Sequence, residues 1–299
     1  MIEAYFLHLM IIACIYIILT ISLNLSMGFT GLLNIGHAAF YGIGAYASAL
    51  LALNFGLPFW IGLLVGGLVA AFFGFLLAFP TLRLRGDYLA LATLGFGFVV
   101  EAVLKNWVDL TRGPLGLPGI PKPELFGFAF DSLLSYFLLS LVFVVITYFV
   151  VSRIVHSPFG RVLKAVRDDE VAAASIGKNV FQFKALALIV SAFFAGIAGS
   201  LYAHYITFID PTSFTVMESM LVISMVVVGG MASVRGSVLG AIVLVLLPEP
   251  LRFLNLPSSM VGALRQLIYA FLLIILVLKR PQGILGEKVF GRKKNVTAT

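Results

Sequence analysis

One long polar stretch, HSPFGRVLKAVRDDEVAAASIGKNVFQF (His156 to Phe183), interrupts a sequence that otherwise consists of nearly continuous apolar runs. From Gly160 to Arg167, a helical spacing of 100° per residue predicts one apolar face and one basic face. The apolar face holds Val162, Leu163, Ala165 and Val166, and the basic face holds Arg161, Lys164 and Arg167. The stretch therefore predicts an amphipathic helix between two hydrophobic segments.

The acidic run Asp168, Asp169 and Glu170 predicts the end of that helix, because a continuation would place Asp169 in the apolar face. Asp169 is suited to N-cap a second short helix over 170–176, with Glu170 in a first turn where the helix dipole favours negative charge. Gly177 is suited to end it. We interpret the two helices as a docking element. The alternative is a membrane-surface helix attracted to anionic lipid, which the acidic run disfavours.

The composition predicts a polytopic membrane protein. Of the 299 residues, 61% are hydrophobic and 11% are charged, and the mean hydropathy is +1.09, whereas about a quarter of the residues in a soluble domain are charged. The net charge of +7 reflects Lys and Arg in short loops and in a basic tail over 280–299, a distribution typical of membrane topology and not of nucleic-acid binding. Cys14 is the one cysteine, which excludes a disulfide framework. We expect a single transmembrane domain over 1–299.

Apolar runs of about 20 residues are long enough to cross a bilayer as helices, and they predict an all-α bundle of eight or nine spans. The candidate runs are 5–23, 35–53, 58–79, 89–104, 133–152, 185–208, 216–229, 238–247 and 264–278. Basic residues predict a cytoplasmic location for the loop with Arg83 and Arg85, for the 156–183 element and for the tail. The loop over 105–132, which is rich in proline and glycine, is then external, as is the N-terminus.

The sequence NLSMGFTGLLNIGHAAFYGIGAYAS (Asn24 to Ser48) is rich in glycine and contains embedded polar side chains. Such residues are tolerated at membrane depth mainly where the backbone is covered by protein or lines a cavity. We therefore predict a broken or re-entrant segment before the second span. The candidate residues of a translocation path are Asn24, Asn34, His37, Tyr41 and Glu101. Hydrogen-bonded helix packing is an equal alternative for His37, and Glu101 also fits a solvated interface position.

Motifs that would power or catalyse a reaction are missing from the sequence. No G-x-x-x-x-G-K-[ST] motif occurs, so ATP binding by this chain is unsupported. The histidines, at positions 8, 37, 156 and 204, are too scattered for a metal site, and no nucleophile-elbow motif is present. Carboxylates inside the spans are few, which disfavours ion-coupled transport. We predict a transport protein that is not an enzyme, binds no cofactor or metal, and is driven by an outside energy source.

Several motifs resemble one protein family, in the same order, over about residues 20–280. The permeases of branched-chain amino acid ABC importers have a cytoplasmic coupling loop and a following span similar to GRVLKAVRDDEVAAASIGKNVFQFKALALIVSAFFAGIAGSLYAHYITFIDP. Their LivM-type subunit, as opposed to its LivH-type partner, has sequences similar to LNLSMGFTGLLNIGHAAFYGIGAYASALL, LRLRGDYLALATLGFGF and TRGPLGLPGIP. The family more broadly shares VVVGGMASVRGSVLGAIVL.

The resemblance implies a type II-like importer half in a bacterial-type inner membrane, with its C-terminus in the cytoplasm. A second permease of the LivH type would complete the pathway, and two cytoplasmic ATPases would bind ATP and Mg²⁺ and dock on the coupling helices. An external binding protein would deliver the substrate to the 105–132 loop and the Asp210–Pro211 turn. The coupling role falls on Gly160, Arg161, Lys164, Arg167, Asp168, Asp169, Glu170 and Gly177.

The predicted substrate is a branched-chain or other hydrophobic amino acid, moved by alternating access when the ATPases displace the 156–183 element. Urea, short amides or nucleosides are alternative substrates for a permease of this kind. An autonomous secondary transporter or channel is the alternative from a different class.

Overall fold

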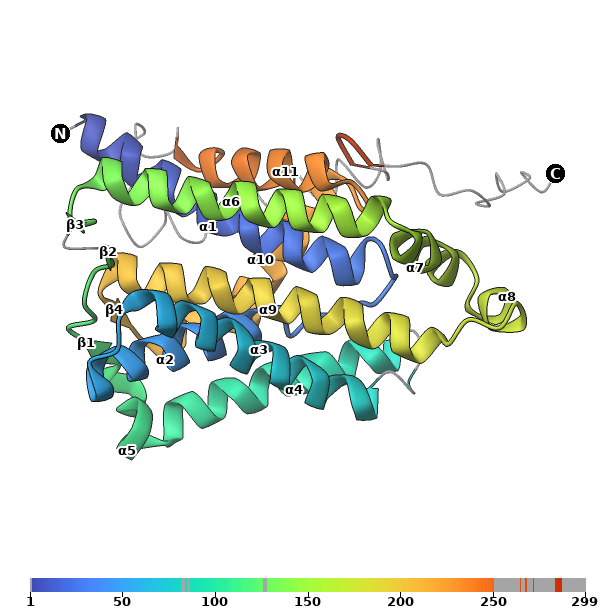
Figure 1. The fold of residues 1–299 in the computed structure, drawn as a ribbon, viewed down its shortest axis with the longest axis horizontal. Helices are drawn as coiled ribbons and strands as arrows, with labels where there is room; N and C mark the ends of the chain where they lie inside the picture. The colour runs from blue at the N-terminus through green and yellow to red at the C-terminus, as the bar shows by residue number, and fades with distance from the viewer. Residues whose placement is uncertain are drawn as a thin grey trace.

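The computed structural model is almost entirely helical in the residues that it describes, and its long helices run side by side (Figure 1). The described residues are 2–81, 84, 87–125, 128–249, 264, 267, 271 and 283–286. In this part of the chain, 6 helices are long and apolar enough to cross a membrane, namely α1 (Ile2–Met27), α2 (His37–Phe55), α3 (Phe59–Thr81), α4 (Asp87–Asn106), α6 (Leu133–His156) and α9 (Val180–Ile206). Two shorter apolar helices are α10 (Val216–Gly229) and α11 (Val234–Leu246).

These helices match the first eight predicted spans in order, with ends that differ from the predicted ones by a few residues. The all-α membrane fold predicted from the sequence is thereby confirmed. The ninth candidate span, 264–278, lies largely outside the described residues, so the total of nine stays a prediction. The basic loop with Arg83 and Arg85 also lies outside them, as does the tail over 280–299 apart from 283–286.

The helices α1 and α9 form the centre of the bundle. α1 packs against α6, α9, α10 and α11, and α9 packs against α2 and α3. Small residues allow the closest contacts: a Cβ atom on Gly44 of α2 would collide with the backbone of Gly196 of α9, and Gly66 of α3 lies against the carbonyl group of Gly44. Close backbone approach is a main source of helix association in a bilayer, where lipid tails are as apolar as the side chains.

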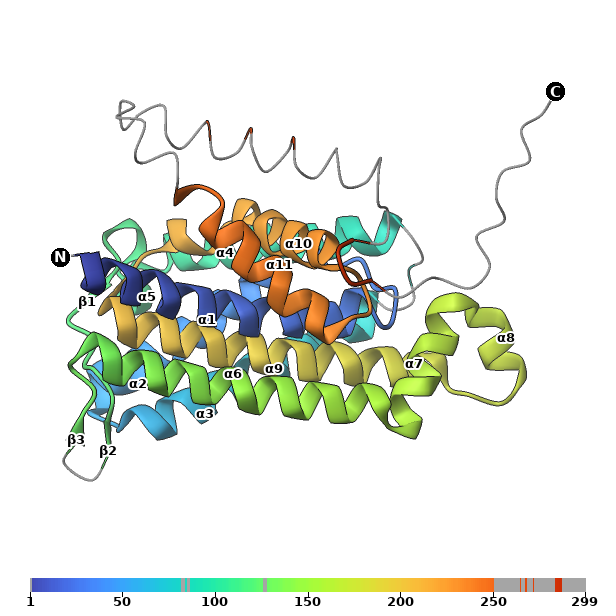
Figure 2. The same cartoon turned by 90° about the horizontal axis from the view of Figure 1, so that it is seen from above.

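The two ends of the bundle differ. α7 (Pro158–Asp168) and α8 (Glu170–Ser175) extend beyond the long helices at one end, called here the α7 end (Figures 1 and 2). The opposite end, called the β4 end, carries α5 (Val108–Thr111), η1 (Gly113–Leu115), β1 (Leu117–Pro118), β2 (Glu124–Leu125), β3 (Phe128–Ala129), β4 (Phe208–Ile209) and η2 (Pro211–Phe214). β1 pairs antiparallel with β4, and β2 pairs antiparallel with β3.

The loop at the β4 end is held to the helices by side chains. His204 Nδ1 donates a hydrogen bond to the carbonyl oxygen of Pro121 at 2.6 Å, while its Nε2 lies 2.9 Å from the Ser48 hydroxyl. Trp60 Nε1 donates to the carbonyl oxygen of Glu124 at 2.9 Å. These bonds anchor the connection between the fourth and fifth spans to α3 and α9.

Candidate functional site

The predicted helix–turn–helix is present as α7 and α8, and the break between them falls at the acidic run. Ser157 caps α7. Asp169 caps α8, because its Oδ1 accepts hydrogen bonds from the N–H groups of Val171 at 2.9 Å and Ala172 at 3.0 Å. Gly177 follows the second helix with a φ of +80°, a left-handed conformation that glycine adopts without strain. The local geometry predicted for this element is confirmed.

The buried face of α7 is narrower than the sequence pattern predicts. Leu163 and Val166 are both 0% exposed. Ala165 is exposed and Val162 is half-buried, so only part of the apolar face packs against the rest of the chain. The physical reason is that α7 lies beyond the spans and contacts the rest of the chain along one side only. Arg161 is exposed, as its place on the basic face predicts.

The other basic residues of α7 face the turn that follows α1. Arg167 Nη1 donates to the carbonyl oxygen of Gly28 at 3.2 Å, and Nη2 of the same residue lies 3.0 Å from the carboxylate of Asp168. Lys164 Nζ lies 5.7 Å from the centroid of the Phe29 ring, within the range of a cation–π contact. α7 is therefore connected to the segment between the first two spans.

Two further contacts fix the element to the bundle. Gly160 lies so close to the carbonyl group of Val155 that a Cβ atom would collide with it. Glu170 forms an ion pair with Lys184 at the start of α9, and the Lys184 side chain is 6% exposed. Sequence reasoning missed Lys184, because a lone lysine in front of an apolar run resembles a topology signal.

The outer surface of α8 is apolar and uncovered in this structure. Val171 is 64% exposed and Ile176 is 71% exposed, and Ala172 and Ala174 beside them are exposed as well. α8 lies at the tip of the molecule, beyond the long helices (Figure 2). Exposed apolar side chains in a group are typical of a surface that another protein covers.

A non-helical segment, 28–36, joins α1 to α2 where the sequence predicts a break. It starts at the α7 end, at the carbonyl group that Arg167 contacts. Its residues then alternate, with Gly31 and Leu33 exposed and Leu32, Asn34 and Gly36 buried. Between α1 and α2 the backbone therefore consists of turns and irregular structure, with one side exposed and the other buried.

The segment lies between α4 and α10. Thr93 of α4 accepts a hydrogen bond from the N–H of Ile35 at 3.0 Å, and its hydroxyl lies 3.3 Å from the carbonyl oxygen of Leu33. On the other side, the N–H of Ala38, in the first turn of α2, donates to the hydroxyl of Ser219 of α10 at 2.8 Å. Single Ser and Thr residues in apolar runs give no sequence signal, so both partners were missed.

Asn34, within this segment, and His37, the first residue of α2, lie together in a buried polar cluster. His37 is 0% exposed, and its Nε2 lies 2.9 Å from the hydroxyl of Ser22 of α1. Asn34 Nδ2 lies 3.5 Å from His37 Nδ1, at the limit of a hydrogen bond, and Asn34 Oδ1 has no partner among the described residues. A buried acceptor without a partner costs about 1–3 kcal/mol. The cluster thus retains hydrogen-bonding capacity that the described residues do not use.

Asn24 lies apart from this cluster, and its side chain stabilises the fold through hydrogen bonds. Its Nδ2 donates to the carbonyl oxygen of Ser233 at 3.0 Å and to the hydroxyl of Ser237 at 2.6 Å. Its Oδ1 accepts a hydrogen bond from the N–H of Ala232 at 3.0 Å. The amide group therefore fastens the turn between α10 and α11 to α1.

The two remaining candidate path residues also lie elsewhere. The ring centroid of Tyr41 is 5.0 Å from that of Phe214 and 5.6 Å from that of Tyr202, in an aromatic cluster of α2, η2 and α9. Glu101 pairs with Lys105, one turn further along α4, at 2.6 Å. The structure thus brings Asn34 and His37 together, and a role in a path stays a prediction for all five candidates. Within the described ranges, no group of three or more His, Cys, Asp or Glu side chains could hold a metal ion.

The chain matches a family model described as "Branched-chain amino acid transport system / permease component" over residues 5–278. It is 42% identical over 294 residues to the high-affinity branched-chain amino acid transport system permease protein LivM of Escherichia coli (strain K12), covering 91% of this chain and 68% of that protein. It is 25% identical over 288 residues to the permease protein LivH of the same strain, covering 91% of each. The guanosine ABC transporter permease protein NupQ of Bacillus subtilis (strain 168) is 27% identical over 194 residues, which are 59% of this chain and 60% of that protein. No solved structure gave a significant match.

Proposed function

The chain belongs to the family of branched-chain amino acid transport permeases, and on this premise we propose that it carries branched-chain amino acids through a membrane, driven by ATP hydrolysed in partner subunits. The observation that carries the proposal is the 42% identity to a LivM permease over 91% of the chain. The family match extends from the first helix past α11, so it includes both the spans and the α7–α8 element.

The proposed assembly has a second permease, two ATPases that hold ATP and Mg²⁺, and an external binding protein. Similarity to both LivM and LivH proteins of one strain supports a LivH-like second permease. The chain would lie in a bacterial-type inner membrane as a type II-like importer half of eight or nine spans, with its C-terminus and the α7 end in the cytoplasm. The binding protein would then meet the 105–132 loop and the Asp210–Pro211 turn at the β4 end.

The ATPase would dock on α8. Its exposed Val171 and Ile176 provide an apolar contact, and the capped turn at Asp169 holds α8 at an angle to α7. The ion pair between Glu170 and Lys184 would pass a displacement of α8 to α9. We expect that Ile176→Asp prevents co-isolation of an ATPase subunit, whereas Lys178→Gln, at an exposed position nearby, does not. Equal co-isolation of both variants would contradict this docking site.

The displacement would reach the spans through Arg167 and Lys164. Both side chains contact the turn after α1, at Gly28 and Phe29, and this turn begins the non-helical segment. Residues 33–36 of this segment donate no helical backbone hydrogen bond among the described residues, so they can change conformation without unwinding a helix. We therefore place the moving part of the translocation path at 28–36.

The exposed side of this segment indicates where the path would lie. Leu33 is 38% exposed, and the N–H groups of Leu33 and Asn34 have no hydrogen-bond acceptor among the described residues. An unpaired backbone group costs several kcal/mol in contact with lipid. The segment must therefore face either water or another protein, and a path shared with a second permease supplies both.

Asn34 and His37 are the proposed contacts for the polar head group of the amino acid. Asn34 Oδ1 is an acceptor without a partner among the described residues and is suited to the ammonium group. The cluster adjoins the N-terminus of α2, where a carboxylate is favoured. The double variant Asn34→Ala/His37→Ala tests this role in a leucine uptake assay. Unchanged uptake at equal expression would exclude it.

Uptake in cells tests the function as a whole. The chain is expressed with its partner subunits in cells that lack their own branched-chain uptake, and labelled leucine, urea and guanosine are compared. We expect ATP-dependent uptake of leucine and background uptake of the other two. Guanosine is the informative competitor, because a guanosine permease is among the relatives. Leucine flux through the purified chain in liposomes without ATP would contradict the proposal and favour an autonomous transporter.

A further inference from the structure

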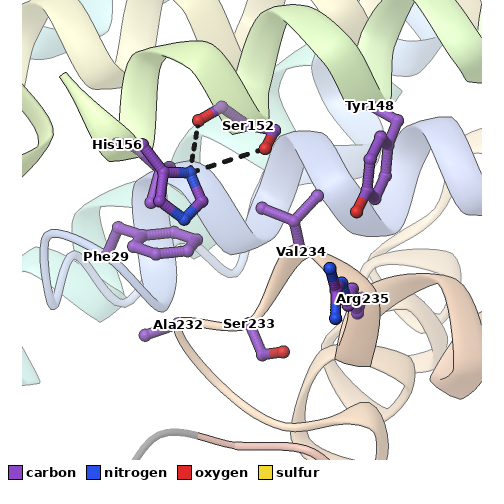
Figure 3. A pocket seen from close by; sticks show the side chains of 9 residues that line it. Phe29, Tyr148, Ser152, His156, Ala232, Ser233, Val234 and Arg235 are labelled. Carbon is purple, nitrogen blue, oxygen red and sulfur yellow. Dashed lines mark hydrogen bonds between the residues drawn. The ribbon is translucent and has the colours of Figure 1, made fainter.

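A cavity of about 350 Å³ lies at the α7 end, outside both regions described above (Figure 3). It is open on one side and is lined by the last turns of α6, by Phe29, and by residues 232–235 at the start of α11. Figure 3 shows the side chains of His156, Tyr148 and Arg235 around it. Among the described residues that line it there is no Asp or Glu, and the two with an ionisable nitrogen, His156 and Arg235, are both basic.

The polar groups of the cavity are available to a ligand. Arg235 is exposed and has no ion pair or side-chain hydrogen bond with another described residue. The carbonyl oxygen of Ser152 lies 2.7 Å from His156 Nδ1 and accepts a hydrogen bond from it, which leaves Nε2 available to another partner. Tyr148 adds a hydroxyl group. Together these groups suit a phosphate oxygen, which accepts several charge-assisted hydrogen bonds.

The start of α11 contributes to the same site. Its cap, Ser233, uses the hydroxyl oxygen to accept from the N–H of Gly236 at 3.0 Å. The N–H groups of Val234 and Arg235 have no acceptor among the described residues. In a helix of 13 residues such first-turn N–H groups, together with the helix dipole, favour an anion. The Arg235 guanidinium would add its charge at the same place.

Apolar stripes on both helices lead into the cavity from the membrane. On α6, Val145 and Phe149 are 59% and 66% exposed, and they lie on the helix face that His156 continues one to two turns further on. On α11, Leu239 and Leu246 are 38% and 37% exposed, on the face that begins with Arg235. The ligand should therefore combine a phosphate group with hydrocarbon chains.

We propose that this cavity binds the headgroup of an anionic phospholipid, with the acyl chains along α6 and α11. A bound lipid would join the end of α6 to the turn that Asn24 fastens to α1, and so stabilise the α7 end of the bundle. The proposal requires only that these helices span a membrane, and it does not rest on the proposed substrate. Free phosphate shares the recognition chemistry, but it would leave the two apolar stripes unused.

Native mass spectrometry of the full chain, purified with whatever subunits co-isolate, tests the site. Phosphatidylglycerol, phosphatidylcholine or inorganic phosphate is added, and retained adducts are counted. We expect one phosphatidylglycerol to be retained about tenfold more tightly than phosphatidylcholine, and Arg235→Gln to remove this preference, because one charge-assisted contact corresponds to about a tenfold change. Arg153→Gln, which removes an exposed arginine near the same end of α6 but outside the cavity, should keep it.

Tyr148→Phe provides a milder second variant that removes only the hydroxyl group, with an expected few-fold loss of phosphatidylglycerol. Three results would overturn the proposal. These are equal retention of both lipids, an equal loss in Arg153→Gln and Arg235→Gln, and saturation of the site by inorganic phosphate without retention of lipid.

Discussion

Asn24 and Asn34 lie near the start of the chain, and the same sequence feature predicted both as residues of a translocation path. In the structure they differ in how far their side-chain amides are hydrogen-bonded. The Asn24 amide forms hydrogen bonds through both its N–H donors and its oxygen acceptor, and these bonds hold the α10–α11 turn against α1. Asn34 is equally buried, but its Oδ1 has no partner among the described residues and its Nδ2 makes a single contact of 3.5 Å. A saturated amide at membrane depth stabilises the fold, whereas an unsaturated one retains capacity for another molecule.

The largest effect is expected for Asn24→Ala. The substitution removes the hydrogen bonds with Ser233, Ser237 and Ala232, and it leaves the buried N–H of Ala232 without an acceptor among the described residues. We expect a loss of about 3 kcal/mol in the free energy of unfolding, measured as a lower thermal midpoint in detergent. Asn106→Ala is the matched control, because that amide makes one exposed bond to the carbonyl of Ala102. Similar midpoints for the two variants would show that Asn24 is not a structural clamp.

Arg167→Gln tests the connection between α7 and the turn that lies between the two asparagines. Loss of the charged hydrogen bond to Gly28 corresponds to about 1.5–3 kcal/mol, so we expect uptake to fall about tenfold or more. ATPase subunits should still co-isolate, because α8 is unchanged. Arg161→Gln removes an exposed charge from the same helix and should leave uptake unaltered. An equal fall in both variants would mean that net charge, and not the contact to Gly28, is what matters.

Asn34→Ala should separate stability from transport. The substitution removes an unpaired buried oxygen and one long contact, so we expect the free energy of unfolding to change by less than about 1 kcal/mol. Leucine uptake should nevertheless fall. A drop in thermal midpoint as large as that of Asn24→Ala would remove the distinction between the two residues.

The smallest effect is expected for Glu101→Gln. The Glu101 side chain is 15% exposed and pairs with the more exposed Lys105 one turn further along α4, and such i,i+4 pairs contribute about 0.2–0.5 kcal/mol. Uptake and thermal midpoint should both match the unaltered chain. A clear loss of uptake at normal stability would instead place Glu101 in the path, as one interpretation of the sequence has it.

Features that depend on neighbouring residues were predictable from the sequence. The cap at Asp169, the stop at Gly177 and the break after α1 all follow from residues within a few positions of one another. The spans follow from hydropathy, because the bilayer sets one length for all of them.

Contacts between distant residues were not predictable. Asn24 meets residues more than 200 positions away, and Arg167 meets a carbonyl group 139 positions away. Neither pairing leaves a periodic pattern in the sequence. For the same reason the sequence predicted the same role, in a translocation path, for Asn24 and Asn34. Only the three-dimensional contacts show that Asn24 fastens a turn and that Asn34 has an acceptor without a partner among the described residues.

Labelling of a cysteine at position 33 tests the central claim, that α7 controls a path at the non-helical segment. Cys14 is the one native cysteine and is buried, so a Leu33→Cys variant gives a clean signal with a water-soluble thiol reagent. In the assembled transporter, we predict that the labelling rate differs between the nucleotide-free and ATP-bound states, and that Arg167→Gln removes this difference. Absence of labelling in every state, or one identical rate in both states, would contradict the account.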